Sequence, residues 1–169
     1  ASRGLSLSYA AFQILVACVF LGFGNVVAYR IAASLVVKPE ARWTAREQAG
    51  KLGVAYMSAS LMSDPQYNLR LGNGYFQRMM NNYGSYPLAV AAYNAGPGNV
   101  NKWLRDNGDP RNGSISWIDW LERIPIFETK NYVQRVIENA VVYNHLNPGR
   151  SSYKGANPAS YFLGKRTPG

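Results

Sequence analysis

The segment AAYNAGPGNVNKWL, residues 91–104, constrains the fold of this chain more than any other stretch. An apolar run breaks into Asn-Ala-Gly-Pro-Gly and then resumes in a helical pattern that contains a tryptophan. Gly96 and Gly98 allow backbone conformations that a side chain would forbid, and Pro97 between them fixes φ and removes a hydrogen-bond donor. The segment therefore predicts that one helix ends and another begins here, with backbone exposed at the junction.

Helix start and stop signals recur on both sides of this junction, and no run of alternating strand residues is present. Asp64 is the predicted N-cap of a helix that has Pro65 at its first position, and Gly84 ends that helix. The stretch PLAVAAYNA is almost wholly apolar, which predicts a central, buried helix. The other predicted helices cover residues 99–108, 117–125 and 128–146, with a loop at 109–114. These patterns predict a mainly α fold.

The last of these helices has one apolar face. Glu128 and Thr129 stand at its start, where the helix dipole favours a carboxylate, and Pro148 ends it. The apolar residues of that face are Tyr132, Val133, Val136, Ile137, Ala140 and Val141.

The charge of the chain favours an anionic partner. The net charge is +9, with only 9 acidic residues, which suits nucleic acid, anionic lipid or an acidic wall polymer. The basic residues are scattered along the sequence, however, and neither a Lys/Arg cluster nor an RNA-binding aromatic motif is present. A nucleic-acid partner is therefore not predicted.

Cysteine and histidine are too scarce for several kinds of site. One cysteine, Cys18, and one histidine, His145, exclude a Cys/His metal cluster and a disulfide within the chain. A Ser-His-Asp triad would have to use His145, which stands near the end of a predicted helix, so this chemistry is not favoured. The counts therefore argue against a metal site built from cysteine and histidine.

The two ends of the chain differ in composition from its middle. Residues 5–37 carry a single charge, Arg30. Within them YAAFQILVACVFLGFGNVVAY is about long enough to cross a bilayer, although Gln13 and Asn25 make it a mediocre span; it is interpreted as a membrane anchor or a signal-like segment. The C-terminal end is rich in Gly, Ser and Pro, which predicts a loosely ordered tail. The predicted division is an apolar segment at 1–40, a helical domain at 41–147 and a tail at 148–169.

Three stretches together resemble one protein family. The segment at 91–104 resembles the signature of lytic transglycosylases of the soluble, goose-lysozyme-like (SLT) type. DPQYNLRLGNGYF upstream and IPIFETKNYVQRVI downstream resemble two further motifs of that family, in the same order. The resemblance covers about residues 41–146 and implies a lysozyme-like helical domain.

The resemblance implies roles for particular residues, beside which simpler interpretations stay open. It places Tyr93 next to the catalytic acid as a substrate-binding residue, although Tyr93 could also be a core tyrosine. Asn94 is a substrate contact or, more simply, a turn former. Glu128 lies in the sugar-binding groove or satisfies the amides of its own helix, and Tyr132 one turn later could follow it into the groove. Structural roles are expected for Asp64, Asn68, Ala95, Gly96, Pro97, Gly98 and Trp103.

The chemistry that the resemblance implies needs one carboxylic acid. A glutamate acts first as general acid and then as general base. The N-acetyl group of the substrate stabilises the cationic sugar, and the 6-hydroxyl attacks within the same sugar. The product is a 1,6-anhydro sugar, and neither metal nor cofactor takes part.

That glutamate is missing from its expected place. In the family it lies in a Glu-Ser motif that precedes a Gly-Leu-Met-Gln segment, and this chain contains neither motif before Ala41. The first acid is Glu40, which has no serine beside it. Three accounts compete: residues 1–40 are a frameshifted stretch, or they are a true anchor on a truncated domain, or Glu40 has taken over the acid role.

The expected function is therefore that of a peptidoglycan lytic transglycosylase that is weakly active or inactive, acting on glycan strands in the periplasm or cell envelope. One alternative is a peptidoglycan-binding module without catalysis. Another is a basic membrane-associated protein, held to the membrane through residues 5–37.

Overall fold

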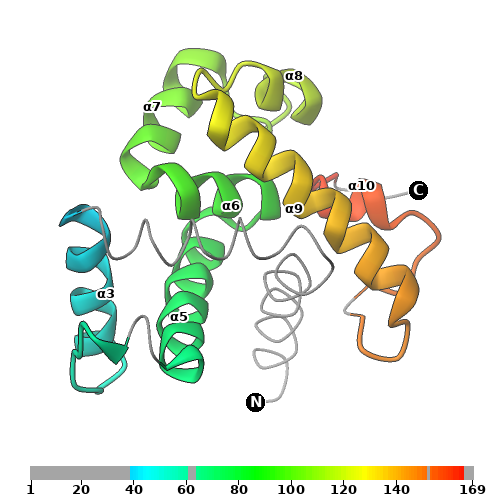
Figure 1. Ribbon diagram of the computed structural model, residues 1–169. Helices are drawn as coiled ribbons and strands as arrows, with labels where there is room; N and C mark the ends of the chain where they lie inside the picture. The colour runs from blue at the N-terminus through cyan, green and yellow to red at the C-terminus, as the bar shows by residue number, and fades with distance from the viewer. Residues whose placement is uncertain (1–38, 61–63, 152, 166–169) are drawn as a thin grey trace. The chain divides into compact units, whose positions relative to one another are not determined.

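The computed structural model describes residues 39–60, 64–151 and 153–165, and these residues form helices and loops without a strand (Figure 1). The mainly α prediction is thereby confirmed. The chain divides into two compact units, residues 1–77 and 78–169. The described helices are α3 (Pro39–Lys51), α5 (Pro65–Tyr83), α6 (Tyr86–Ala95), α7 (Pro97–Asn107), α8 (Trp117–Glu122), α9 (Phe127–Leu146) and α10 (Pro158–Phe162).

The predicted apolar span at residues 5–37 lies outside the described residues. So does most of the segment at 1–40 for which an anchor or a frameshift was considered; Glu40 is the second residue of α3. Among the helices that the structure describes, none combines the length and the apolar character needed to cross a membrane.

In the first unit, α3 packs beside the first part of α5. The helix α5 starts where predicted, because the amide of Tyr67 donates a hydrogen bond of 3.1 Å to Asp64 Oδ1. Ala45 and Ala49 of α3 meet Leu71 of α5 in a small buried core. Asn68, expected to be structural, lies in α5.

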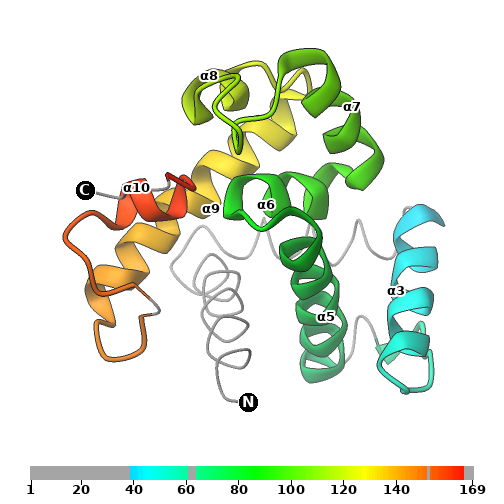
Figure 2. The ribbon, with the colours of Figure 1, turned by 180° about the vertical axis from the view of Figure 1, so that it is seen from behind.

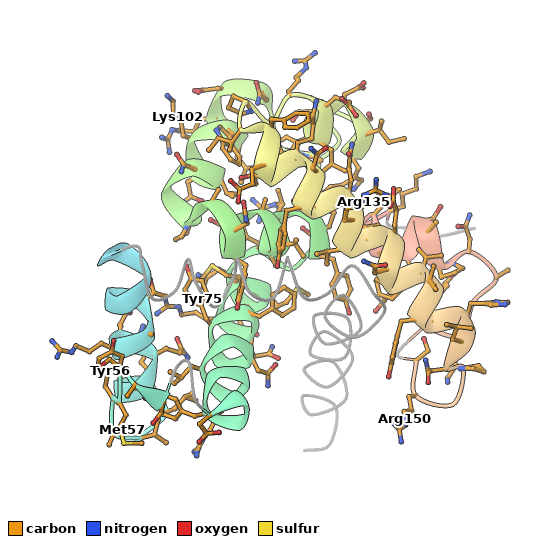
Figure 3. The ribbon with its side chains drawn as sticks, in the orientation of Figure 1. Tyr56, Met57, Tyr75, Lys102, Arg135 and Arg150 are labelled. Carbon is orange, nitrogen blue, oxygen red and sulfur yellow. The ribbon has the colours of Figure 1, made fainter. Side chains whose placement is uncertain are left out.

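The turn that follows α3 is fastened to α5 by one tyrosine. The Tyr67 hydroxyl donates to the carbonyl of Ala55 (2.9 Å) and accepts from the amide of Met57 (3.1 Å). Tyr56, labelled with Met57 in Figure 3, lies under the guanidinium of Arg46, 5.2 Å from ring centroid to Cζ.

In the second unit, α6 is the central helix, as its composition predicted. Every residue from Tyr86 to Ala92 is buried. Both α7 and α9 pack against it, and α8 and α10 pack against α9. Figures 1 and 2 show the crossing of α9 over α6 from opposite sides. The alanines of α6 have short side chains, so two neighbouring helices can approach it closely.

The helix α8 is short and is fixed at both ends. The amide of Asp119 donates to Ser116 Oγ (3.0 Å), which satisfies a free amide of the first turn. At the other end, Glu122 accepts from Lys130 Nζ and from Gln134 Nε2 of α9, each at 3.2 Å. The helix stops three residues before Pro125.

The helix α9 begins one residue earlier than predicted, at Phe127. Its predicted inner face is confirmed for Val133, Val136, Ile137 and Ala140, which are buried. Tyr132 and Val141, expected on the same face, are half-buried.

The C-terminal residues differ from the loosely ordered tail that their composition predicted. Residues 158–162 form α10, whose first turn is capped by Asn157 through the amide of Ser160 (3.1 Å). Phe162 is buried and meets the Tyr86 ring of α6 edge-on, with centroids 5.2 Å apart. Aromatic side chains thus supply the apolar area that a Gly- and Pro-rich segment lacks on average.

Candidate functional site

The junction between α6 and α7 is a single residue. Gly96 has φ 86° and ψ 148°, a conformation open almost only to glycine. Its amide closes α6 by donating to the carbonyl of Ala92 (2.9 Å), and α7 begins at Pro97, the next residue. The predicted ending of one helix and immediate start of another is confirmed, and Gly96 is what allows it.

The second glycine has a different role from the one predicted. The helix α7 starts at Pro97 instead of Asn99, so Gly98 lies in its first turn. Gly98 does not have a positive φ, and a Cβ built on it would meet no atom within 4 Å. The expectation that Gly98 needs glycine for its backbone conformation is therefore wrong.

One side-chain hydrogen bond ties α7 to the end of α6, and one face of α7 is buried. Asn99 Nδ2 donates to the carbonyl of Ala95 (2.8 Å), which the helix end would otherwise leave without an intrahelical partner. Trp103 is buried on the inner face of α7, as expected for a packing residue.

A hydrogen bond joins this junction to the start of α9. Thr129 Oγ1 donates to Asn94 Oδ1 over 2.6 Å, linking residues that are 35 positions apart. Thr129 is 1% exposed, whereas Asn94 is exposed. The last turn of α6 and the first turn of α9 are thus fixed to each other at the level of side chains. This contact supports a structural role for Asn94.

The other predicted substrate-binding residues lie next to this link. Tyr93 precedes Asn94 and is half-buried, while Glu128 precedes Thr129 and is exposed in the first turn of α9. Tyr132, one turn further along α9, is half-buried. The packing of α9 against α6 and the Thr129–Asn94 bond place the ends of the two helices that carry these residues next to each other. Glu40, Asp64 and Asn68 belong to the first unit.

Sequence reasoning missed Tyr83, the last residue of α5. Its hydroxyl lies 3.1 Å from the carbonyl oxygen of Pro97 and 2.9 Å from Asn101 Oδ1, in donating geometry to both. The side chain is 6% exposed. The contact spans 14 to 18 positions and follows no periodic pattern, so no signal in the sequence singles it out.

The loop at 109–114 was predicted from the sequence, but the contacts within it were not. Arg111 donates two hydrogen bonds to the Asp109 carboxylate, from Nε to Oδ1 (2.9 Å) and from Nη2 to Oδ2 (2.6 Å). Its Nη1 donates to the carbonyl of Tyr83 (3.3 Å). The hydrogen bonds from Arg111 lower the pKa of Asp109 below its ordinary value. The loop is therefore tied to the same residue that supports the start of α7.

Positive charge is spread over several elements of the second unit. Figure 3 labels Lys102 on α7, Arg135 on α9 and Arg150 after α9. Arg135 is paired with Glu138 (2.8 Å) on the surface of α9. The basic residues are thus spread over the structure, as they are along the sequence. Within the described ranges, no group of three or more His, Cys, Asp or Glu side chains is placed to hold a metal ion.

Comparison with known proteins gives one family. Residues 36–115 match the family model described as "Transglycosylase SLT domain". The match covers α3, α5, α6 and α7 and ends in the loop before α8, so Glu128 and Tyr132 lie beyond it.

Similar curated proteins are named soluble lytic murein transglycosylases. The soluble lytic murein transglycosylase of Salmonella typhimurium is 34% identical over 91 residues, which are 53% of this chain and 14% of the relative. The protein of that name from Escherichia coli strain K12 gives the same identity and coverage. The chain thus spans about one seventh of the length of these relatives.

Proposed function

We propose that the ligand of this chain is the glycan strand of peptidoglycan, because residues 36–115 match the transglycosylase SLT family model. The proposed reaction is non-hydrolytic cleavage between N-acetylmuramic acid and N-acetylglucosamine, which leaves a 1,6-anhydro-N-acetylmuramic acid end. Relatives named for the same activity on murein support this choice. The proposal places the protein in the cell envelope, where that polymer is found.

One observation carries the proposal: the hydrogen bond from Thr129 to Asn94, which fixes α9 to the α6–α7 junction. Tyr93 and Asn94 come from one resembling motif and Glu128 comes from another, and this bond brings the two motifs together in space. Sugar recognition needs such a set, because aromatic rings cover the apolar faces of a pyranose while amide and carboxylate groups pair with its hydroxyls.

The proposed roles follow from chemistry and exposure. Glu128, exposed in the first turn of α9, is an acceptor for sugar hydroxyl or N-acetyl amide groups. Tyr93 and Tyr132 are half-buried, so each presents part of a ring and leaves the rest in the fold. The amide oxygen of Asn94 accepts from Thr129, which fixes the residue that directly follows Tyr93.

Cleavage also needs an acid that protonates the leaving oxygen. The family's Glu-Ser pair is missing ahead of residue 41, and Glu40 in α3 is the first acid of the chain. We therefore propose that turnover by this chain is slow or absent. Losing a general acid typically lowers a rate by about 10² to 10⁴.

The experiment is digestion of purified peptidoglycan, with mass analysis of the soluble products. Anhydro-muropeptides above the level of a heat-unfolded control support the transglycosylase function, and their loss in Glu40→Gln would assign the acid to Glu40. Hydrolysed ends that carry one added water contradict the proposed reaction.

A second candidate is a glycan-binding module without turnover, and the missing Glu-Ser pair favours it. In that case the protein binds insoluble peptidoglycan and releases no muropeptide. A protein that binds anionic vesicles and ignores peptidoglycan would instead support the membrane-associated alternative.

A further inference from the structure

Tyr83 makes contacts to which neither the family resemblance nor the proposed function assigns a role. It is the last residue of α5, and its ring is buried at the base of the α6–α7 junction. Its hydroxyl reaches the carbonyl of Pro97 (3.1 Å) and Asn101 Oδ1 (2.9 Å), which are the first residue of α7 and a residue one turn later.

The backbone of Tyr83 is held as well. Its carbonyl accepts from Arg111 Nη1 (3.3 Å), and the same guanidinium is fixed by the Asp109 carboxylate. The residue therefore connects three segments, namely the end of α5, the first turn of α7 and the loop at 109–114. Gly84, which has φ 65°, follows it and turns the chain away from α5.

We propose that Tyr83 is a positioning residue that fixes the first turn of α7, and through it the Gly96 junction, for binding of the glycan strand. The consequence for binding rests on the proposed function, whereas the effect on the turn does not.

The need for such a support follows from the junction itself. With glycine as its only linking residue, α7 has a pivot of high backbone freedom at Gly96. Asn99 ties α7 back to Ala95 within the junction, and Tyr83 adds a contact from the end of α5, a helix outside the junction. The Tyr83 hydroxyl contacts α7 at Pro97, where the helix begins, and at Asn101, one turn later. These two contacts limit the rotation of α7 about Gly96.

The chain offers a matched control for the removal of this hydroxyl. Tyr67 in the first unit also uses its hydroxyl for two contacts, with Ala55 (2.9 Å) and Met57 (3.1 Å). Tyr83→Phe and Tyr67→Phe therefore delete the same atom, and in each case the deleted hydroxyl has the two partners named above. A general loss of stability affects both variants, and a loss of positioning at the junction affects only the first.

Two measurements on the full chain test the proposal. Hydrogen exchange followed by mass spectrometry should show faster exchange at residues 96–103 in Tyr83→Phe and not in Tyr67→Phe. Calorimetric titration with soluble glycan strands freed of their peptides should show a Kd about fivefold higher for Tyr83→Phe, the size expected for one hydrogen bond, and an unchanged Kd for Tyr67→Phe. Asn101→Ala, which removes an exposed partner, should shift both readouts in the same direction.

Unchanged exchange at residues 96–103 in Tyr83→Phe overturns the proposal, and so does an equal increase over the whole chain in both variants. Changed exchange with unchanged glycan affinity overturns its binding consequence. If the wild-type chain itself does not bind the strands, the proposed function fails, while the exchange measurement still decides whether Tyr83 fixes the turn.

Discussion

At the scale of single residues, side chains that lie far apart in sequence hold the candidate site together. The bond between Thr129 and Asn94 joins α9 to α6, and the contact of Tyr83 with Pro97 joins α5 to α7. Asn94 and the family position of Glu128 could be found from the sequence, because local motifs mark them. The pairing of Thr129 with Asn94 and of Tyr83 with Pro97 could not, since a contact across many positions is decided by packing and leaves no periodic trace.

The Thr129–Asn94 bond should appear as a coupling energy in a double-mutant cycle. Thr129→Val, Asn94→Ala and the double variant are compared with the wild type by urea unfolding. The expected coupling is about 0.5–1.5 kcal/mol, the usual net contribution of a hydrogen bond. Effects of the two single changes that simply add would contradict a bond between these residues.

The ion pair between Asp109 and Arg111 should make stability depend on pH. Arg111 lowers the folded-state pKa of Asp109 below its ordinary value of 3.8, so the pair stabilises the fold at higher pH. This contribution is lost as the pH falls below about 4 and through the lowered pKa.

The stability difference between wild type and Asp109→Asn should therefore shrink on acidification, as measured by urea unfolding between about pH 6 and pH 2. Its size at neutral pH should stay below about 1 kcal/mol, because Arg111 is 40% exposed and solvent screens the pair. A difference that is constant over this range would show that the pair does not form.

At the scale of elements, caps and apolar runs predicted most of the helices. Asp64 and Pro65 fixed the start of α5, and the apolar stretch at 87–95 identified α6. The start of α7 was placed two residues late, because Gly98 was interpreted as part of the turn. The helix α10 was missed, because five residues give too short a pattern and its stability comes from tertiary contacts.

The two glycines of the junction give opposite predictions for one substitution. Gly96→Ala should destabilise the fold by about 1–3 kcal/mol, because the conformation of Gly96 is strained for any other residue. Gly98→Ala should leave stability unchanged or raise it by up to about 1 kcal/mol, since alanine favours a helix more than glycine does. Thermal unfolding of both variants tests this, and similar losses for the two would contradict the assigned backbone conformations.

The packing of α10 should be visible in stability. Phe162 is 3% exposed, so Phe162→Ala is expected to cost about 3 kcal/mol through lost burial and a cavity. Phe127→Ala deletes the same ring at a position that is 73% exposed and is expected to cost less than about 0.5 kcal/mol. If thermal unfolding shows equal stability for wild type and Phe162→Ala, α10 does not contribute to the folded core.

At the scale of the whole molecule, the residues proposed to bind the glycan are easier to place than a catalytic acid. The SLT match covers residues 36–115, and the predicted binding residues gather at α6 and α9 in the second unit. A net charge of +9 adds a general attraction to anionic polymers. Specific binding must therefore be separated from charge, which salt screens over distances beyond about 10 Å at 0.1 M.

The most direct test of the account is sedimentation of the chain with insoluble peptidoglycan at about 0.5 M salt, where surface charge is largely screened. The account predicts saturable binding that soluble glycan strands compete away and that a double Tyr93→Ala, Glu128→Ala variant loses. Wild-type protein that stays in the supernatant, or a double variant that sediments as well as the wild type, would contradict it.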